Sequence, residues 1–214
     1  MTSFTPSAAT ARLQAEHEFT IDGAHTSPAA AVTTLQITHD TLETRTHDVI
    51  HQGQSVTIDR YTHQYSSKTS EVTDRLVFTI EGLHRSILVT SAGNELLIDI
   101  NHLRFRVTPA SARQIIEMLT QDGNDSVYIA ANIMQPFYIS TGSGDDTVVT
   151  SAGLADVFTG PGNDRVMTSE GRTYIETGDG DDVVNASGSG VMTVYTGKGH
   201  DFVRAGTGRC YIET

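Results

Sequence analysis

The last third of the chain repeats one pattern four times, a Thr-Gly-x-Gly-x-Asp block. The blocks occupy residues 141–146, 159–164, 177–182 and 196–201, and their closing aspartates lie 18, 18 and 19 residues apart. A unit this short cannot bury a hydrophobic face by itself, so a fixed period of this size predicts coils that stack on one another and share a core. The pattern therefore predicts a solenoid.

The same rhythm continues at half the period. Glycine recurs about every nine residues, and a β-branched aliphatic residue follows each glycine by four positions. These glycine and aliphatic pairs are Gly144 and Val148, Gly153 and Val157, Gly162 and Val166, Gly171 and Ile175, Gly180 and Val184, Gly190 and Val194, Gly199 and Val203, Gly208 and Ile212. A glycine at each corner and one inward aliphatic residue per half-coil predict flattened coils with a short strand on each side.

The blocks resemble the repeats-in-toxin (RTX) family, whose nonapeptide reads Gly-Gly-x-Gly-x-Asp-x-(aliphatic)-x. The resemblance covers about residues 120–214 and implies a parallel β-roll that binds calcium through its turns. Carried over position by position, it implies calcium carboxylates at Asp146, Asp164, Asp182 and Asp201. It implies carbonyl ligands at Gly142, Gly144, Gly160, Gly162, Gly178, Gly180, Gly197 and Gly199.

Calcium takes about six to eight hard oxygen ligands, more than one turn of this kind offers, so each ion must be shared between the turns of adjacent coils. A weaker fifth copy, residues 121–127, adds Asp125 as a candidate ligand 21 residues before Asp146. Counting the gaps between successive aspartates predicts three well-formed sites and a fourth next to Asp125. The alternative interpretation is that Asp and Asn occur here because they favour tight turns.

The chain departs from the family pattern at two positions. The first residue of each block is Thr where the family has Gly. The aspartate position of the alternate half-repeats holds residues that are not carboxylates, namely Ala155, Thr173, Met192 and Cys210. We therefore expect calcium along one edge of the roll only, with hydrogen-bonded turns along the other.

Composition limits the classes of partner. The chain has 214 residues and a net charge of −12, which is unfavourable for binding phosphate backbones or anionic membranes. Its single cysteine, Cys210, excludes an internal disulfide framework. No stretch approaches the about 20 apolar residues of a membrane span, and no signal peptide opens the sequence. We expect calcium as the ligand, neither nucleic acid nor a membrane span, and a host protein or glycan as a further candidate partner.

Calcium modules with Kd values of about 10⁻⁴ to 10⁻³ M are filled outside cells. We therefore expect a bacterial protein that is secreted or delivered into a host cell, of the toxin, effector or adhesin type. Export signals of such families usually follow the last repeat. The chain is thus expected either to be the front part of a longer protein or to be exported through its Ser/Thr-rich start, residues 1–10.

Residues 1–31, low in large apolar residues, predict a mobile arm, and residues 32–108 predict a small antiparallel β domain. Its expected strands are residues 32–38, 56–62, 75–81, 86–90, 95–100 and 103–108. Pro109 in the first turn, followed by Ala112, Ile115, Ile116 and Leu119 at helical spacing, predicts a helix over residues 109–120 that caps the roll of residues 121–214.

One alternative function rests on histidines. His47 and His51 have the His-x-x-x-His spacing of the zinc-protease helix, with Asp48 at the position of the catalytic Glu. Against it, the Thr-rich flanks favour a strand. The alternative function is the front part of a secreted hydrolase or zinc metallopeptidase effector, whose catalytic domain lies beyond Thr214 or which uses His47 and His51. We find no nucleophile elbow and no phosphate loop, and we assign no catalytic residue.

Overall fold

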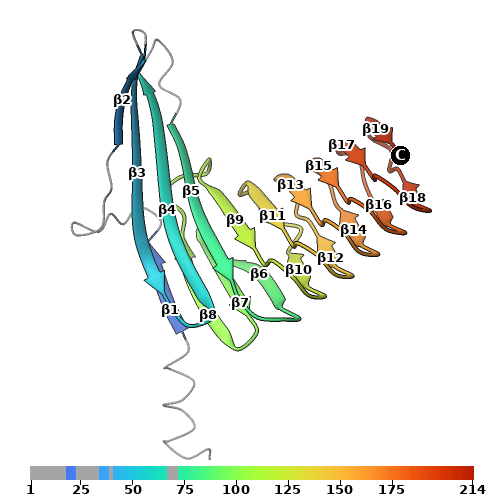
Figure 1. The fold of residues 1–214 in the computed structure, drawn as a ribbon, viewed down its shortest axis with the longest axis horizontal. Helices are drawn as coiled ribbons and strands as arrows, with labels where there is room; N and C mark the ends of the chain where they lie inside the picture. The colour runs from blue at the N-terminus through green and yellow to red at the C-terminus, as the bar shows by residue number, and fades with distance from the viewer. Residues whose placement is uncertain (1–17, 23–33, 39–40, 67–71) are drawn as a thin grey trace, which may run out of the picture.

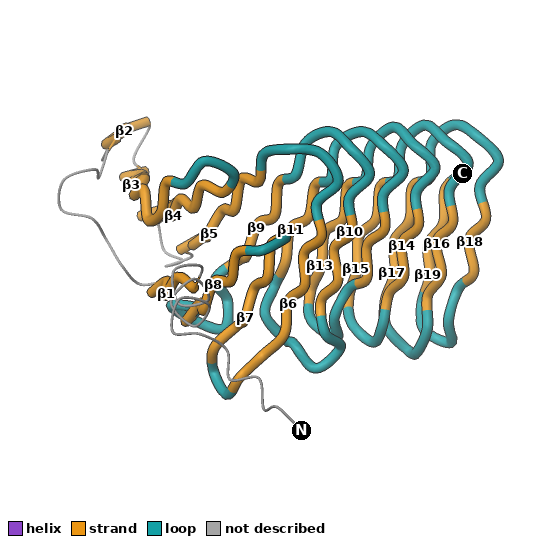
Figure 2. The backbone as a smooth tube through the Cα atoms, turned by 90° about the horizontal axis from the view of Figure 1, so that it is seen from below, coloured by secondary structure: helices purple, strands orange, loops and turns teal. Residues whose placement is uncertain are grey.

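The computed structural model describes residues 18–22, 34–38, 41–66 and 72–214. These residues form β-strands and turns and contain no helix. From β9 onward the chain alternates between two sheets and builds a β-solenoid of about five turns (Figure 1). Figure 2 shows the coils stacked side by side, each with one strand per sheet and a turn at either edge.

The first sheet has nine strands in the order β1-β8-β7-β6-β10-β12-β14-β16-β18. Its strands are β1 (Glu18–Asp22), β6 (Ser86–Ala92), β7 (Glu95–Ile100), β8 (Leu103–Thr108), β10 (Ser126–Ile129), β12 (Thr147–Val149), β14 (Arg165–Thr168), β16 (Val183–Ala186) and β18 (Phe202–Arg204).

The second sheet has ten strands in the order β19-β17-β15-β13-β11-β9-β5-β4-β3-β2. Its strands are β2 (Thr34–Thr38), β3 (Thr41–Gln52), β4 (Val56–Ser66), β5 (Val72–Ile80), β9 (Ile115–Leu119), β11 (Phe137–Ser140), β13 (Leu154–Phe158), β15 (Arg172–Glu176), β17 (Val191–Tyr195) and β19 (Cys210–Glu213).

The solenoid strands pair in parallel, and their register stacks the aliphatic residues of successive coils. In the first sheet Val148 pairs with Val166, and Val166 with Val184. These three residues are fully buried, as are their counterparts of the second sheet, Val157, Ile175 and Val194. The predicted aliphatic column is thus confirmed except at the last coil, where Val203 is half-buried and Ile212 is 41% exposed.

The antiparallel region predicted for residues 32–108 is present, but its strands belong to the two solenoid sheets. Hairpins join β3 to β5 in one sheet and β6 to β8 in the other, and a single hydrophobic core runs from Ile58 and Phe78 to Val194. β7 and β8 have the predicted bounds, whereas β3 was not predicted. The predicted arm lies outside the described residues apart from β1, which pairs with β8.

The predicted capping helix over residues 109–120 is wrong, because its second half is strand β9. Ile116 and Met118 are buried, while the intervening Glu117 faces outward and accepts a hydrogen bond from Arg75 at 3.1 Å. β9 pairs in parallel with β5 and β11, so the coil that begins the stack is built from strand rather than helix. Pairing with β5 and β11 makes this segment a strand, in which alternate residues such as Ile116 and Met118 face the core. This long-range pairing outweighs the helical spacing of the apolar residues.

Candidate metal centre

Five aspartates form a column along one edge of the stack, each at the residue before a strand of the first sheet. We call this the aspartate edge; its turns are residues 120–125, 141–146, 159–164, 177–182 and 196–201. In each pair of adjacent coils the later aspartate's Oδ1 accepts a hydrogen bond from the backbone N–H of the earlier one. These N···O distances are 2.7 Å for Asp125 to Asp146, 2.8 Å for Asp146 to Asp164, 2.8 Å for Asp164 to Asp182 and 3.0 Å for Asp182 to Asp201.

The second carboxylate oxygen of the three central aspartates lacks a partner. Asp146, Asp164 and Asp182 are 1–2% exposed, and their buried Oδ2 atoms make no hydrogen bond within the part of the chain that the structure describes. Leaving a buried polar atom unpaired costs about 1–3 kcal/mol, and more when the group is charged. Three such atoms in one row form an arrangement of donor oxygens that could hold a cation.

The pKa values of these carboxyls also show that the ionised form is unfavourable in this environment. Burial raises the pKa of Asp164 to about 6, against the opposing effects of the nearby Thr159 hydroxyl and the Asp146 N–H. The neighbouring charges of Asp146 and Asp182 raise it further. Burial also raises the pKa values of Asp146 and Asp182. The ionised column is therefore unfavourable unless a cation compensates it.

The block glycines let the turns of adjacent coils approach closely. Gly162 has φ +151°, and a Cβ there would lie 2.0 Å from the carbonyl oxygen of Gly144. Gly180 repeats this contact at 1.7 Å from the carbonyl oxygen of Gly162. Only glycine fits such positions. Within the described part of the chain, the carbonyl oxygens of the predicted ligand glycines accept no hydrogen bond; these are Gly142, Gly144, Gly160, Gly162, Gly178, Gly180, Gly197 and Gly199.

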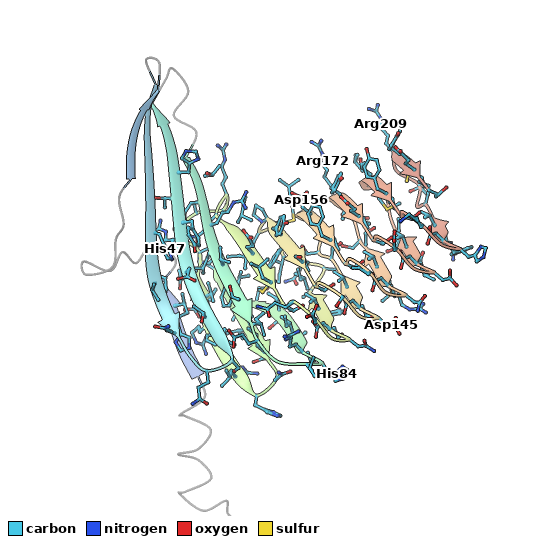
Figure 3. The ribbon with its side chains drawn as sticks, viewed as in Figure 1. His47, His84, Asp145, Asp156, Arg172 and Arg209 are labelled. Atoms are coloured by element: carbon cyan, nitrogen blue, oxygen red, sulfur yellow. The ribbon has the colours of Figure 1, made fainter. Side chains whose placement is uncertain are left out.

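A second, exposed column runs beside the aspartates and was not predicted from the sequence. It comprises Asn124, Asp145, Asn163, Asp181 and His200. Here the side chain of one coil accepts a hydrogen bond from the N–H of the next, at 2.8 Å from Asn163 to Asp145 and 2.8 Å from His200 to Asp181. Asp145 marks this edge in Figure 3, well away from Asp156 and Arg172 of the second sheet. In the aspartate column the earlier coil donates to the later one, and in the exposed column the later coil donates to the earlier one.

The donor set fits calcium. Carboxylate and carbonyl oxygens are its preferred ligands, and two turns must contribute to reach its coordination number. Within the described residues no three His, Cys, Asp or Glu side chains cluster to hold a metal, so main-chain oxygens must complete any site. In the gap between Asp146 and Asp164, and in the gap between Asp164 and Asp182, both aspartates have an Oδ2 without a hydrogen-bond partner in the described chain. In the gap 182/201, Asp201 is partly exposed to solvent.

The opposite edge, with turns at residues 150–153, 169–171, 187–190 and 205–209, is built differently. Hydroxyl groups there donate to the carbonyl of the preceding coil, at 3.2 Å from Ser169 to Thr150 and 2.9 Å from Ser187 to Thr168. The alternate-repeat residues Ala155, Thr173 and Met192 lie in strands and are 2–4% exposed, so they line the core; Cys210, on the last strand, is exposed. The opposite edge thus carries the hydrogen-bonded turns expected of it.

The zinc alternative loses its geometric basis. His47 and His51 lie on strand β3 rather than on a helix, and a β-bulge between Val49 and His51 shifts the register. His47 bonds Asp59 at 3.0 Å and stacks on Tyr61, whereas His51 packs edge-on against the buried Phe105. The two imidazoles therefore have separate surroundings and do not form a shared metal site.

Comparison with known families identifies the repeat. Residues 158–189 match a family model described as the RTX calcium-binding nonapeptide repeat (4 copies). The matched segment contains the turns of Asp164 and Asp182, two of the three aspartates with an unpaired oxygen. No curated protein and no solved structure matches the chain. No described helix has the length and apolarity required to cross a bilayer.

Proposed function

We propose that this chain is a calcium-responsive β-roll module, in which calcium ions bind between adjacent turns of the aspartate edge and lock the coils together. The observation that carries the proposal is the row of buried, unpaired Oδ2 atoms on Asp146, Asp164 and Asp182. The RTX repeat and the solenoid fold support it.

Each ion would lie in a gap between two coils. Asp146, Asp164, Asp182 and Asp201 would supply the carboxylates, and the glycine carbonyls that accept no hydrogen bond would supply main-chain oxygens. Calcium supplies positive charge and many oxygen contacts at once. The hydrogen bonds from each aspartate N–H keep one carboxylate oxygen fixed, so the other is already oriented before the ion arrives.

Without the ion, successive carboxylates are stacked at roughly the 4.8 Å spacing of adjacent strands and repel one another. The ion-free roll is therefore looser or partly unfolded at neutral pH. Binding and ordering are then the same event, because the ion binds the stacked coils and has little affinity for separated turns. Calcium acts as a folding signal rather than as a catalyst.

This behaviour suits a protein that meets calcium after leaving the cell that makes it. Modules with Kd values of about 10⁻⁴ to 10⁻³ M stay empty in cytosol and fill outside, and RTX repeats are typical of secreted bacterial proteins. We place the module in a secreted or host-delivered bacterial toxin, effector or adhesin. The antiparallel strands β3 to β8 are its candidate surface for a host protein or glycan.

The test is a calcium titration of the chelated protein followed by far-UV circular dichroism, with magnesium as the matched control. The proposal predicts a gain of β-signal and a sharper thermal transition with calcium and little change with magnesium, which resists losing its water ligands. The same spectrum and melting temperature in chelator and in excess calcium would contradict it.

A further inference from the structure

The aspartate column has an arginine at its first position. Ser86 of β6 pairs with Ser126 of β10, and Ser126 pairs with Thr147 of β12, so Arg85 stands where the next coils have Asp125 and Asp146. The backbone N–H of Arg85 donates to Oδ1 of Asp125 at 2.7 Å, the same bond that links each aspartate to the next. His84, its neighbour, lies along the same edge as Asp145 in Figure 3.

The Arg85 side chain binds the oxygens of the neighbouring turn. One guanidinium nitrogen, Nη1, donates to Oδ2 of Asp125 at 3.0 Å and to the Asp122 carbonyl at 2.7 Å. The side chains of this ion pair are 2% and 0% exposed. A carboxylate oxygen and a main-chain carbonyl oxygen of one turn are the oxygen types that calcium would use in later gaps.

Asp125 consequently differs from the aspartates that follow it. Its Oδ2 is paired with Arg85, whereas the Oδ2 atoms of Asp146, Asp164 and Asp182 have no partner in the described chain. A calcium ion between Asp125 and Asp146 would have to compete for an oxygen already held by a buried cation, and it would be repelled by that cation at short range. Arg85 lies on the side of Asp125 away from Asp146. Asp125 therefore borders the first gap of the column with its charge already neutralised by the chain itself, unlike the aspartates of the later gaps.

We propose that Arg85 is a built-in cation that takes the place of calcium at the start of the stack and limits the column to three ions. These three ions occupy the gaps 146/164, 164/182 and 182/201. The first coil is then ordered without calcium and offers a template on which calcium orders the later coils. The inference rests on the proposed calcium function and adds its stoichiometry and its starting point.

The test compares bound calcium in the full chain and in three variants after equilibrium dialysis, by metal analysis. Wild type should hold three ions. Arg85→Gln, which frees Asp125, should hold four. Arg85→Lys keeps a cation and should hold three. The matched control is Arg75→Gln, which removes the 3.1 Å pair with Glu117 on the second sheet and should also hold three.

A second measurement does not depend on the ion count. In chelator, Arg85→Gln should melt below wild type because the buried Asp125 carboxylate loses its partner, and excess calcium should remove this difference. Adding Asp125→Asn to Arg85→Gln should restore the three-ion count. Four ions in wild type, or three in Arg85→Gln with no calcium rescue, would overturn the inference. No bound calcium in wild type would instead contradict the proposed function.

Discussion

The two edges of the solenoid close the same coils in different ways. Along the opposite edge, hydroxyls such as that of Ser187 bond the preceding coil directly. Along the aspartate edge, the buried carboxylates of Asp146, Asp164 and Asp182 accept one hydrogen bond each from a main-chain N–H and keep a second oxygen unpaired. Both edges share one core and one strand register, so the difference lies in the turns alone. Both edges have hydroxyl-to-carbonyl hydrogen bonds between coils, which on the aspartate edge come from Thr141, Thr159 and Thr177. The aspartate edge adds a row of buried, unpaired carboxylate oxygens, for which we propose an external cation.

The largest effect on this comparison is expected from Asp164→Ala. Asp164 borders two gaps, so the variant should lose two of three calcium ions. At calcium about 100-fold above Kd each site contributes about 2.7 kcal/mol, so about 5 kcal/mol of calcium-dependent stabilisation should disappear. Calorimetric titration measures the number of bound ions, and unfolding in the presence of calcium measures the loss of stabilisation. Asp156→Ala, an exposed aspartate on the outer face of β13, is the control and should change neither.

The close approach of coils on the aspartate edge predicts a large cost for Gly162→Ala. The new Cβ would meet the Gly144 carbonyl oxygen at 2.0 Å on a backbone with φ +151°. We expect a loss of about 3 kcal/mol or more in unfolding free energy. Gly93→Ala, in an open hairpin with φ +70°, should cost only about 1 kcal/mol. Equal losses in denaturant unfolding would show that the turns are not in contact.

The pH dependence of the chelated protein gives a smaller effect of defined sign. Because burial raises the pKa of Asp164 from 3.8 to about 6, the folded state binds more protons than the unfolded state within this window. The stabilisation that protonated Asp164 contributes to the folded state is fully present below pH 3.8 and is lost as the pH rises through about 6. We expect a loss on the order of 3 kcal/mol.

The measurement is urea unfolding of wild type and Asp164→Asn in chelator at a series of pH values. The substitution removes the titrating carboxyl, so the fall in stability between about pH 4 and pH 7 should be shallower in the variant. Parallel curves for the two proteins would refute the assignment of this slope to Asp164. Calcium binding should weaken below about pH 6, because protons compete for the same oxygens.

The smallest effect concerns the opposite edge. Ser187→Ala removes the 2.9 Å hydrogen bond to the Thr168 carbonyl and should cost about 1 kcal/mol. It should leave the number of bound calcium ions unchanged. A lower ion count in this variant, measured by the same titration as for Asp164→Ala, would mean that the two edges do not act independently.

The sequence predicted the repeating part well because its signals are local and periodic. The spacing of Asp146, Asp164 and Asp182 placed these residues in one column, and the glycine period placed Val148 and Val157 in the core. Alternation likewise gave the bounds of β7 and β8. Whether the predicted oxygens bind calcium remains a prediction of this repeat pattern.

The errors arose where distant segments decide the structure. Ile115, Ile116 and Leu119 fit a helix, but β9 lies between β5 and β11, and that pairing cannot be read locally. β3 was also missed, although it pairs with its sequence neighbours β2 and β4. Arg85 had one available signal: Arg85-Ser-Ile repeats the order of Asp125-Ser-Val before a strand. Arg85 is positively charged whereas the other residues of the aspartate column are negatively charged, so a search for repeated aspartates does not find it.

The central claim is that calcium occupies the gaps of one edge, and crystals grown with calcium test it most directly. An anomalous difference map should show three peaks in a row between Asp146, Asp164, Asp182 and Asp201, about 4.8 Å apart as the strand spacing requires. The opposite edge should show none. A map with no peak along the aspartate edge, or with peaks between the turns of the opposite edge, would contradict the account.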